Sequence, residues 1–195
     1  MKKLLITGFE PFGGETINPS WDAVSLLPES VSGYTLTKLC LPVAFEKSAK
    51  ILVETAEKLC PDVIISVGQA GGRSAITPEY LGINLRNANT PDNDGNQPKD
   101  ERIFDDGQDA YFSTIPVRKI AENIKNNGID AQVSYSAGTF VCNDVLYTLL
   151  SRFKGTTIKV GFIHVPYSTD QGKEPSMSLD DIVKGLTIAI KTLEG

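Results

Sequence analysis

Short runs of apolar residues recur along the chain and alternate with segments that have helical spacing. The runs have the length of strands, and their continuous apolar character is typical of strands buried on both faces of a sheet. They occupy residues 4–7, 36–41, 63–67, 131–134 and 158–164. We predict that these five runs are the strands of the fold.

The segments between the runs repeat apolar side chains every three or four residues, which is the period of an α-helix. These periodic segments span residues 21–27, 45–59, 117–124, 141–153 and 182–193. Pro28, Pro61 and Gly128 follow the first three, where helix stops are expected. Strands that alternate with helices need crossover connections. The sequence therefore predicts an α/β fold, a single-domain three-layer α/β/α sandwich with a mainly parallel twisted sheet.

Residues 86–101 interrupt the alternation. This segment, RNANTPDNDGNQPKDE, is dense in turn-forming residues and almost free of apolar ones, so we expect it to contribute nothing to the core. Long loops of this kind are functional lids, disordered segments or interfaces. We see no repeat or linker, and a chain of 195 residues fits one domain that buries about 70% of its unfolded surface. We therefore expect one domain over residues 1–195.

Charge and composition exclude several classes of partner. The formal net charge is −5 and no block of Lys and Arg is present, which argues against a nucleic-acid binder. No apolar run approaches the about 20 residues that a membrane span needs. The N-terminal apolar stretch, residues 4–6, is too short for a signal peptide, so we expect no membrane association and no export.

The cysteines and the only histidine are the candidate reactive groups. Cys40, Cys60 and Cys142 are odd in number and widely spaced, so neither a disulfide framework nor a metal knuckle is expected. We interpret them as cytoplasmic thiols. His164 must supply any imidazole chemistry, since no other histidine exists.

Cys142 precedes or opens a periodic helix, where free N–H groups and the helix dipole favour a thiolate and hence a nucleophile. The alternative is a buried structural cysteine, because Cys142 also belongs to an apolar stripe with Leu146, Leu149 and Phe153.

His164 ends an apolar strand, at the sheet edge where ligands gather in α/β folds. Its alternative is a core imidazole bonded to a backbone carbonyl.

Two glycine-rich turns follow predicted strands. The turn at 68–72, GQAGG, matches neither dinucleotide nor phosphate-loop patterns, so we expect no nucleotide cofactor. Glu79 lies after it and is a candidate to orient the imidazole, although loop carboxylates are commonly only solvated. In the turn after the first strand, Phe9 and Phe12 are either core residues or walls of a flat pocket.

Eight motifs follow one another in order along nearly the whole chain. They are TGFEPFGG (7–14), NPSW (18–21), VGQAGGR (67–73), ITPE (76–79), PDN (91–93), YFST (111–114), SAGTFVCN (136–143) and HVPY (164–167). With these motifs the chain resembles the type I pyroglutamyl peptidases, also called pyrrolidone-carboxylate peptidases, which are cysteine peptidases. The resemblance implies a single catalytic domain that removes an N-terminal pyroglutamyl residue from peptides, with no metal and no cofactor.

The resemblance also implies roles for particular residues. Cys142 corresponds to the nucleophile that forms a thioester, His164 to the base and acid, and Glu79 to the residue that orients the imidazole. The pyroglutamyl pocket corresponds to the following residues: Phe9, Phe12, Gln69, Phe140 and Val141. A neutral, flat lactam suits aromatic faces and paired hydrogen bonds. The expected partners are peptides with N-terminal pyroglutamate and further copies of the chain in a homotetramer.

The chain departs from the family pattern at two positions near the expected site. Tyr80 and Asn89 stand where relatives commonly have arginine. If the arginine at the second position helps to place the triad or the oxyanion in relatives, Asn89 must act by hydrogen bonding alone, or Arg86 or Arg73 must substitute for it. Two other functions stay open: a related thiol amidohydrolase of shifted specificity, and a non-catalytic small-molecule binding module of phosphorylase-like α/β shape. Asn18, before Pro19, is also interpreted as a helix N-cap.

Overall fold

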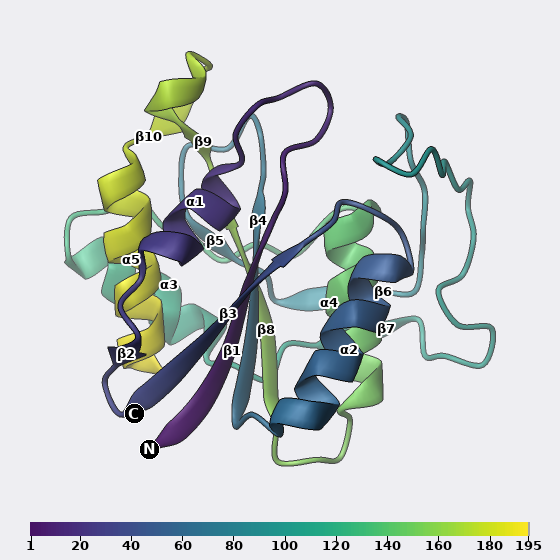
Figure 1. Cartoon of the computed structure of the whole chain (residues 1–195), viewed down its shortest axis with the longest axis horizontal. Coiled ribbons are helices and arrows are strands. Elements are labelled where there is room, and N and C mark those ends of the chain that lie inside the picture. Colours follow the sequence, from purple (N-terminus) through teal and green to yellow (C-terminus); the bar gives the residue numbers. More distant parts are fainter. Residues whose placement is uncertain (195) are drawn as a thin grey trace.

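Within residues 1–194, which the computed structural model describes, a six-stranded sheet forms the middle of the fold (Figure 1). The strand order is β2-β3-β1-β4-β8-β5, and β3, β1, β4 and β8 are parallel. The strands are β1 (Lys2–Phe9), β2 (Ser30–Val31), β3 (Tyr34–Leu41), β4 (Val63–Gln69), β5 (Thr77–Pro78) and β8 (Lys159–Val165). Only the short edge strands β2 and β5 pair antiparallel, so the predicted mainly parallel sheet is confirmed.

Helices cover both faces of the sheet, as the alternating pattern predicts. One face carries α1 (Pro19–Leu26), α3 (Val117–Asn126) and α5 (Leu179–Thr192), and the other carries α2 (Lys47–Leu59) and α4 (Val141–Arg152) (Figure 1). Each helix coincides with one predicted periodic segment. The strands are buried on both sides because each helical layer forms its own apolar cluster against the sheet. The three-layer prediction is confirmed.

Local signals set the helix ends. Asn18 caps α1 by accepting a hydrogen bond from the Ser20 N–H, with Pro19 in the first helical position. Cys60 ends α2 in the left-handed conformation directly before Pro61, a position that more often holds glycine. Gly128 follows α3 with a positive φ of 80°. The N-cap interpretation of Asn18 is therefore confirmed.

Residues 131–134 do not form the predicted strand. The segment lies parallel to residues 76–80, but it is joined to them only by isolated bridges at Ile76 and Glu79. Pro78 lies between these two bridges and has no N–H to donate, so the hydrogen-bond ladder is interrupted there. The apolar run predicts the location of the edge segment, and the proline on its neighbour prevents a continuous strand.

The remaining elements are short and lack a periodic signal. β6 (Leu81–Ile83) pairs with β7 (Ala110–Phe112), and β9 (Tyr167–Ser168) pairs with β10 (Ser176–Met177) around the 3₁₀ turn η1 (Thr169–Gln171). β6 and β7 pack against α4, and β9 and β10 lie between β8 and α5 in the chain.

The loop at 86–101 is folded back on itself between β6 and β7 and projects beyond α2 and α4 (Figure 1). Arg86 and Glu101 exchange two backbone hydrogen bonds, and the Ala88 N–H donates to Pro98. Ala88 is only 4% exposed and packs in the apolar cluster of α2 and α4. The expectation that this segment contributes nothing to the core is therefore wrong, because the loop closes over that cluster.

In residues 1–194 no helix is long and apolar enough to cross a membrane.

Candidate active site

A cavity of about 260 Å³ lies where neighbouring parallel strands end. Phe9 and Gln69 are the last residues of β1 and β4, and His164 is the penultimate residue of β8. The cavity lining consists of Phe9, Phe12, Asn18, Val43, Gln69, Ala70, Gly71, Arg73, Ala137, Gly138, Phe140, Val141, Cys142 and His164. Carboxyl ends of parallel strands are the usual ligand position in open α/β sheets. The structure thus brings together seven of the eight candidate residues, and the eighth, Glu79, is buried behind His164.

Gly68 leaves room for the Cys142 side chain beside β8. Gly68 is the register partner of His164 across β4 and β8. A Cβ placed on Gly68 would lie 2.9 Å from Cys142 Sγ and 2.8 Å from the Phe162 ring, closer than real contacts. The cysteine sulfur therefore packs directly over the backbone beside His164, and any larger residue at 68 would displace it.

Polar side chains fix the first turn of α4, where Cys142 is the second residue. Asn143 is fully buried; its Oδ1 accepts from the Ile83 N–H at 2.9 Å, and its Nδ2 donates to the Ile83 and Leu85 carbonyls. Asp144, also buried, accepts from the Glu46 N–H at 2.8 Å. These bonds attach the helix start to β6 and to the loop before α2, so the position of Cys142 is held from several sides.

The pKa of the Cys142 thiol is raised to about 12. Burial raises it most and the negative charge of Glu79 raises it too, while the nearby Arg73 and the thiol's own backbone N–H act to lower it. The helix start acts in the expected direction, since the backbone N–H lowers the thiol pKa, but burial outweighs this effect. A base must remove the proton as the sulfur reacts.

His164 is held in one orientation. Its Nδ1 lies 2.7 Å from Glu79 Oε1, and its ring packs on Phe162 with the ring centroids 4.7 Å apart. The ring is 4% exposed. A carboxylate accepts a hydrogen bond from Nδ1, which leaves Nε2 as the unprotonated nitrogen of the neutral imidazole. Nε2 is therefore the atom that is available as a base.

Glu79 is a buried carboxylate held by two donors. Its side chain has no exposed surface, and its Oε1 accepts from His164 and, at 2.7 Å, from Arg73 Nη1. Burial acts to raise the pKa of this carboxyl. The hydrogen bond from His164, the charge that the imidazole carries when it is protonated, and smaller contributions from Ser134 and Arg73 outweigh burial, and the pKa is lowered. Glu79 is thus ionised beside the imidazole, as a residue that orients a catalytic histidine needs to be.

Aromatic rings form the apolar walls of the cavity. Phe12 and Phe140 lie with ring centroids 6.3 Å apart, and Phe45 supports Phe140 edge-on from behind at 5.1 Å. Phe9 is 2% exposed and packs on Phe162, so it belongs to the core while one edge faces the cavity. The two alternatives for Phe9, core residue and pocket wall, are therefore both realised.

Two amides organise the polar side of the cavity. Gln69 Oε1 accepts a hydrogen bond from Gln171 Nε2 at 2.9 Å, so the Gln69 Nε2 donor is directed away from that contact. Asn93, in the long loop, donates to Glu10 Oε1 and to the Pro11 carbonyl. The tip of the loop at 86–101 is thereby attached to the turn that carries Phe12.

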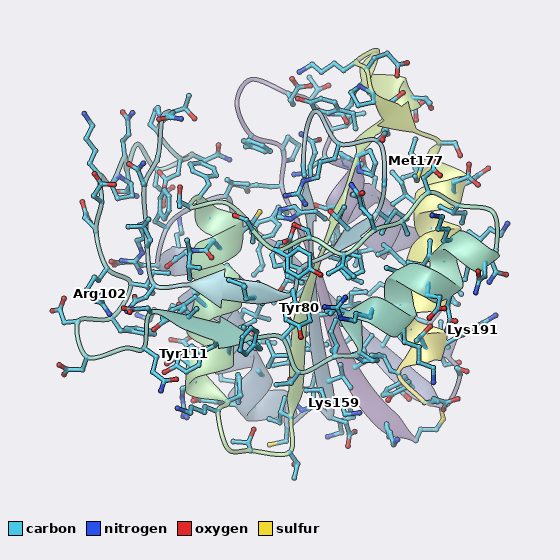
Figure 2. All side chains as sticks on the ribbon, turned by 180° about the vertical axis from the view of Figure 1, so that it is seen from behind. Tyr80, Arg102, Tyr111, Lys159, Met177 and Lys191 are labelled. Carbon is cyan, nitrogen blue, oxygen red and sulfur yellow. The ribbon has the colours of Figure 1, made fainter. Side chains whose placement is uncertain are left out.

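The two departures from the family pattern lie outside the cavity lining. Tyr80 is near the centre of the face in Figure 2, with its ring 5.5 Å from those of Phe112 and Tyr135 and with Arg118 above it at 5.2 Å. Asn89 is exposed in the long loop. Neither side chain lines the cavity, although Tyr80 directly follows Glu79 in the chain.

The two arginines expected to compensate take different positions. Arg73 lines the cavity and bonds Glu79, whereas Arg86 pairs with Asp144 at 2.8 Å and with Glu46 at 2.8 Å, away from the cavity. Only Arg73 therefore places a positive charge at the site.

Sequence reasoning did not assign Gly68 or Asn143 to the site. Asn143 directly follows Cys142 within the motif SAGTFVCN (136–143). A buried amide at the start of a helix needs hydrogen-bond partners, so it is a recognisable signal for a contact that fixes the helix start. Gly68 lies in a turn motif, but its contact with Cys142 depends on tertiary packing. In residues 1–194 no cluster of three or more His, Cys, Asp or Glu side chains is arranged to hold a metal ion.

Comparison with known proteins agrees with this geometry. A family model described as pyroglutamyl peptidase matches residues 2–194. The pyrrolidone-carboxylate peptidase of Thermosipho africanus is 51% identical over 197 residues, covering 98% of this chain and 96% of that protein. The corresponding Clostridium perfringens protein is 49% identical, covering 98% of this chain and 92% of that protein.

Solved structures show the same fold. The crystal structure of Bacillus amyloliquefaciens pyroglutamyl peptidase I aligns with a TM-score of 0.95 and 48% identity, covering 99% of this chain and 97% of that chain. The pyrrolidone carboxyl peptidase from Thermococcus litoralis aligns with a TM-score of 0.94 and 40% identity, covering 100% and 94%. The resemblance found in the sequence motifs is thereby confirmed, and the chain belongs to the pyroglutamyl peptidase family of cysteine peptidases.

Proposed function

We propose that this chain is a pyroglutamyl peptidase that hydrolyses the amide bond after an N-terminal pyroglutamyl residue, with residues 1–195 as its single catalytic domain. Cys142 is the nucleophile, His164 the base and acid, and Glu79 the residue that orients the imidazole. The pocket for the lactam consists of Phe9, Phe12, Gln69, Phe140 and Val141.

One observation carries the proposed substrate class: among the described residues that line the cavity, none is Asp or Glu. An ordinary N-terminal ammonium would enter this space without a partner for its charge, at a large desolvation cost. Pyroglutamate has no ammonium, since its nitrogen is closed into a neutral lactam ring. The aromatic walls of Phe12 and Phe140 suit the flat ring, and the free donor of Gln69 suits the lactam carbonyl.

The resting thiol sets the first half of the reaction. Because the Cys142 pKa is raised to about 12, His164 Nε2 takes the thiol proton while Sγ forms a bond to the pyroglutamyl carbonyl carbon. The developing oxyanion lies at the start of α4, where first-turn N–H groups have no partner within the helix. Charge on the imidazole is balanced by the ionised Glu79 at 2.7 Å.

The second half releases both products. His164 gives its proton to the amine nitrogen, the C–N bond breaks, and the shortened peptide leaves behind a thioester on Cys142. Nε2 then takes a proton from water as the water oxygen attacks the thioester carbonyl. Collapse of this intermediate returns the proton to sulfur and releases pyroglutamate, so one imidazole serves both steps.

A panel of reporter amides tests the activity. We expect the purified protein to release the reporter amine from a pyroglutamyl amide and not from prolyl or glutamyl amides. Turnover of only the other amides would instead support the thiol amidohydrolase of shifted specificity. If the pyroglutamyl ligand bound without turnover of any amide, the non-catalytic binding module would be favoured.

We also propose a cytoplasmic homotetramer. The cytoplasmic location is supported by Cys40, Cys60 and Cys142, which are all free thiols. An exposed aromatic surface at Phe112 and Tyr135, 67% and 55% exposed, is available for contacts between subunits. Light scattering coupled to size-exclusion chromatography measures the mass in solution, and a monomeric mass would contradict the assembly.

A further inference from the structure

Arg73 is a charged residue of the cavity lining to which the reaction above gives no role. Its guanidinium bonds three segments of the chain. Nη1 donates to Thr77 Oγ1 at 2.6 Å and to Glu79 Oε1 at 2.7 Å, and Nη2 donates to the Ser136 carbonyl at 3.0 Å. One planar group therefore connects the glycine-rich turn, β5 with the residue after it, and the segment that leads into α4.

Arg73 and His164 bond the same atom. Glu79 Oε1 accepts from Arg73 Nη1 and from His164 Nδ1, each at 2.7 Å. The position of this oxygen sets the direction of the Nδ1 bond and hence the direction of Nε2 on the other side of the ring. The planar guanidinium of Arg73 is fixed because Thr77 Oγ1 and the Ser136 carbonyl also accept its hydrogen bonds. It can therefore define where Glu79 Oε1 lies.

The hydrogen bond from Arg73 also acts to lower the pKa of Glu79, although less than His164 does. A carboxylate with no exposed surface loses its hydration, and burial alone favours the protonated form. Arg73 remains 29% exposed, partly through a second hollow that is lined by residues 132–136, so the cation keeps contact with water. It can therefore compensate the charge of Glu79 at small cost to itself.

We propose that Arg73 is a positioning residue for the reaction, which holds Glu79 Oε1 in line with His164 Nδ1. The proposal rests on the proposed function, since it needs the imidazole to act as the base. A direct contact between Arg73 and substrate is the main competing role, because the side chain also lines the cavity.

Kinetics of Arg73→Gln separate these roles. The variant loses the positive charge and the planar set of N–H donors of the guanidinium. We predict that kcat on a pyroglutamyl amide falls about 10- to 100-fold, because Glu79 and His164 would no longer be held in their catalytic positions. KM should change less than about threefold, because ground-state binding is not its role. Arg73→Lys keeps the charge and should recover part of kcat.

The pH profile gives a second readout. The ionisable groups around the guanidinium are Glu79, His164, Cys142 and Tyr135. Removing a positive charge favours the protonated forms of the carboxyl and the thiol. The profile of kcat/KM should therefore shift to higher pH in Arg73→Gln and stay in place in Arg73→Lys.

Arg102→Gln is the matched control, since Arg102 also bonds a carboxylate, Asp109, and a backbone carbonyl, that of Gly107, away from the cavity. We expect it to match the wild type in kcat and pH profile. A raised KM with unchanged kcat in Arg73→Gln would overturn the inference in favour of substrate contact, and a lower thermal midpoint with unchanged kinetics would overturn it in favour of a structural role. An inactive wild-type protein would overturn the proposed function instead.

Discussion

Two buried carboxylates, Glu79 and Asp144, resemble each other closely and differ in what surrounds them. Neither side chain has exposed surface, and each accepts a bond from one arginine, Arg73 at 2.7 Å and Arg86 at 2.8 Å. Only Glu79 also accepts a hydrogen bond from an imidazole, that of His164. Of the two arginines, only Arg73 lines the cavity. Burial acts to raise the pKa of both groups, yet the pKa of Glu79 is lowered and that of Asp144 is raised.

The second donor accounts for the difference. His164 gives Glu79 a hydrogen bond and, when the imidazole is protonated, a positive charge beside it, whereas Asp144 receives its other bond from the backbone N–H of Glu46. We infer that the same type of buried pair serves catalysis at Glu79 and holds α4 in place at Asp144. An arginine–carboxylate pair alone therefore says little about function, and the imidazole beside the cavity is the informative feature.

The largest expected effect comes from removing the imidazole. His164→Ala should lower kcat/KM on a pyroglutamyl amide at least about 10⁴-fold, because no other histidine exists to replace it. The thermal midpoint should stay within a few degrees of the wild type. Parallel activity assays and thermal unfolding measure both quantities, and equal losses of folding and activity would favour a structural imidazole.

The two carboxylates should separate in activity. Glu79→Gln removes the charge that balances the imidazole and should lower kcat by about 10³- to 10⁴-fold. Asp144→Asn, assayed well below its thermal midpoint, should lose less than about tenfold, because its contacts lie away from the cavity. Steady-state kinetics on both variants decide this, and similar losses would remove the distinction between the pairs.

Stability should change in the opposite order. Asp144→Asn removes the buried one of the two counter-charges of Arg86, which is 11% exposed and keeps its bond to the exposed Glu46, and should cost about 1–3 kcal/mol of unfolding free energy. Glu79→Gln should cost less, because Arg73 is 29% exposed and keeps its bonds to Thr77 and Ser136. Urea unfolding of the two variants measures the difference. A larger loss in Glu79→Gln would contradict it.

The smallest expected effect is a difference in the pH dependence of stability. The pKa of Glu79 lies below its ordinary 4.5, so its contribution is present above that value and is lost as pH falls through the lowered pKa. The pKa of Asp144 lies above its ordinary 3.8, so its contribution is present below that value and is lost as pH rises through the raised pKa.

Urea unfolding at several acidic pH values tests these opposite signs. On acidification, the stability gap between wild type and Glu79→Gln should shrink, while the gap between wild type and Asp144→Asn should widen. Gaps that move in the same direction for both variants would show that the two carboxylates have similar environments.

The long elements were predictable because their signals are local. Buried parallel strands and amphipathic helices leave apolar runs and a helical period in the sequence, and all five predicted helices are present. β5 has two residues and no such signal, and the interruption at Pro78 separates residues 131–134 from a continuous strand. Whether a short edge strand forms depends on the segment that it pairs with, and no local sequence pattern specifies that partner.

The site was predictable where motifs mark it and not where packing decides. Cys142, His164 and Glu79 lie in motifs, and the structure brings Cys142 and His164 to one cavity. The raised pKa of Cys142 was not predictable, because a helix start favours a thiolate and only the fold shows the burial that outweighs it. The hydrogen bond from Arg73 to Glu79 was likewise not predictable, because it depends on the conformation of the turn that carries Arg73.

The central claim is that Cys142 is the nucleophile of a pyroglutamyl peptidase. The most direct test is hydrolysis of a pyroglutamyl reporter amide across pH by the wild type and by Cys142→Ala, with Cys60→Ser as the control for an exposed thiol. We predict turnover by the wild type and the control and none by Cys142→Ala at any pH, with all three proteins folded. Turnover by folded Cys142→Ala at a rate near that of the wild type would contradict the claim.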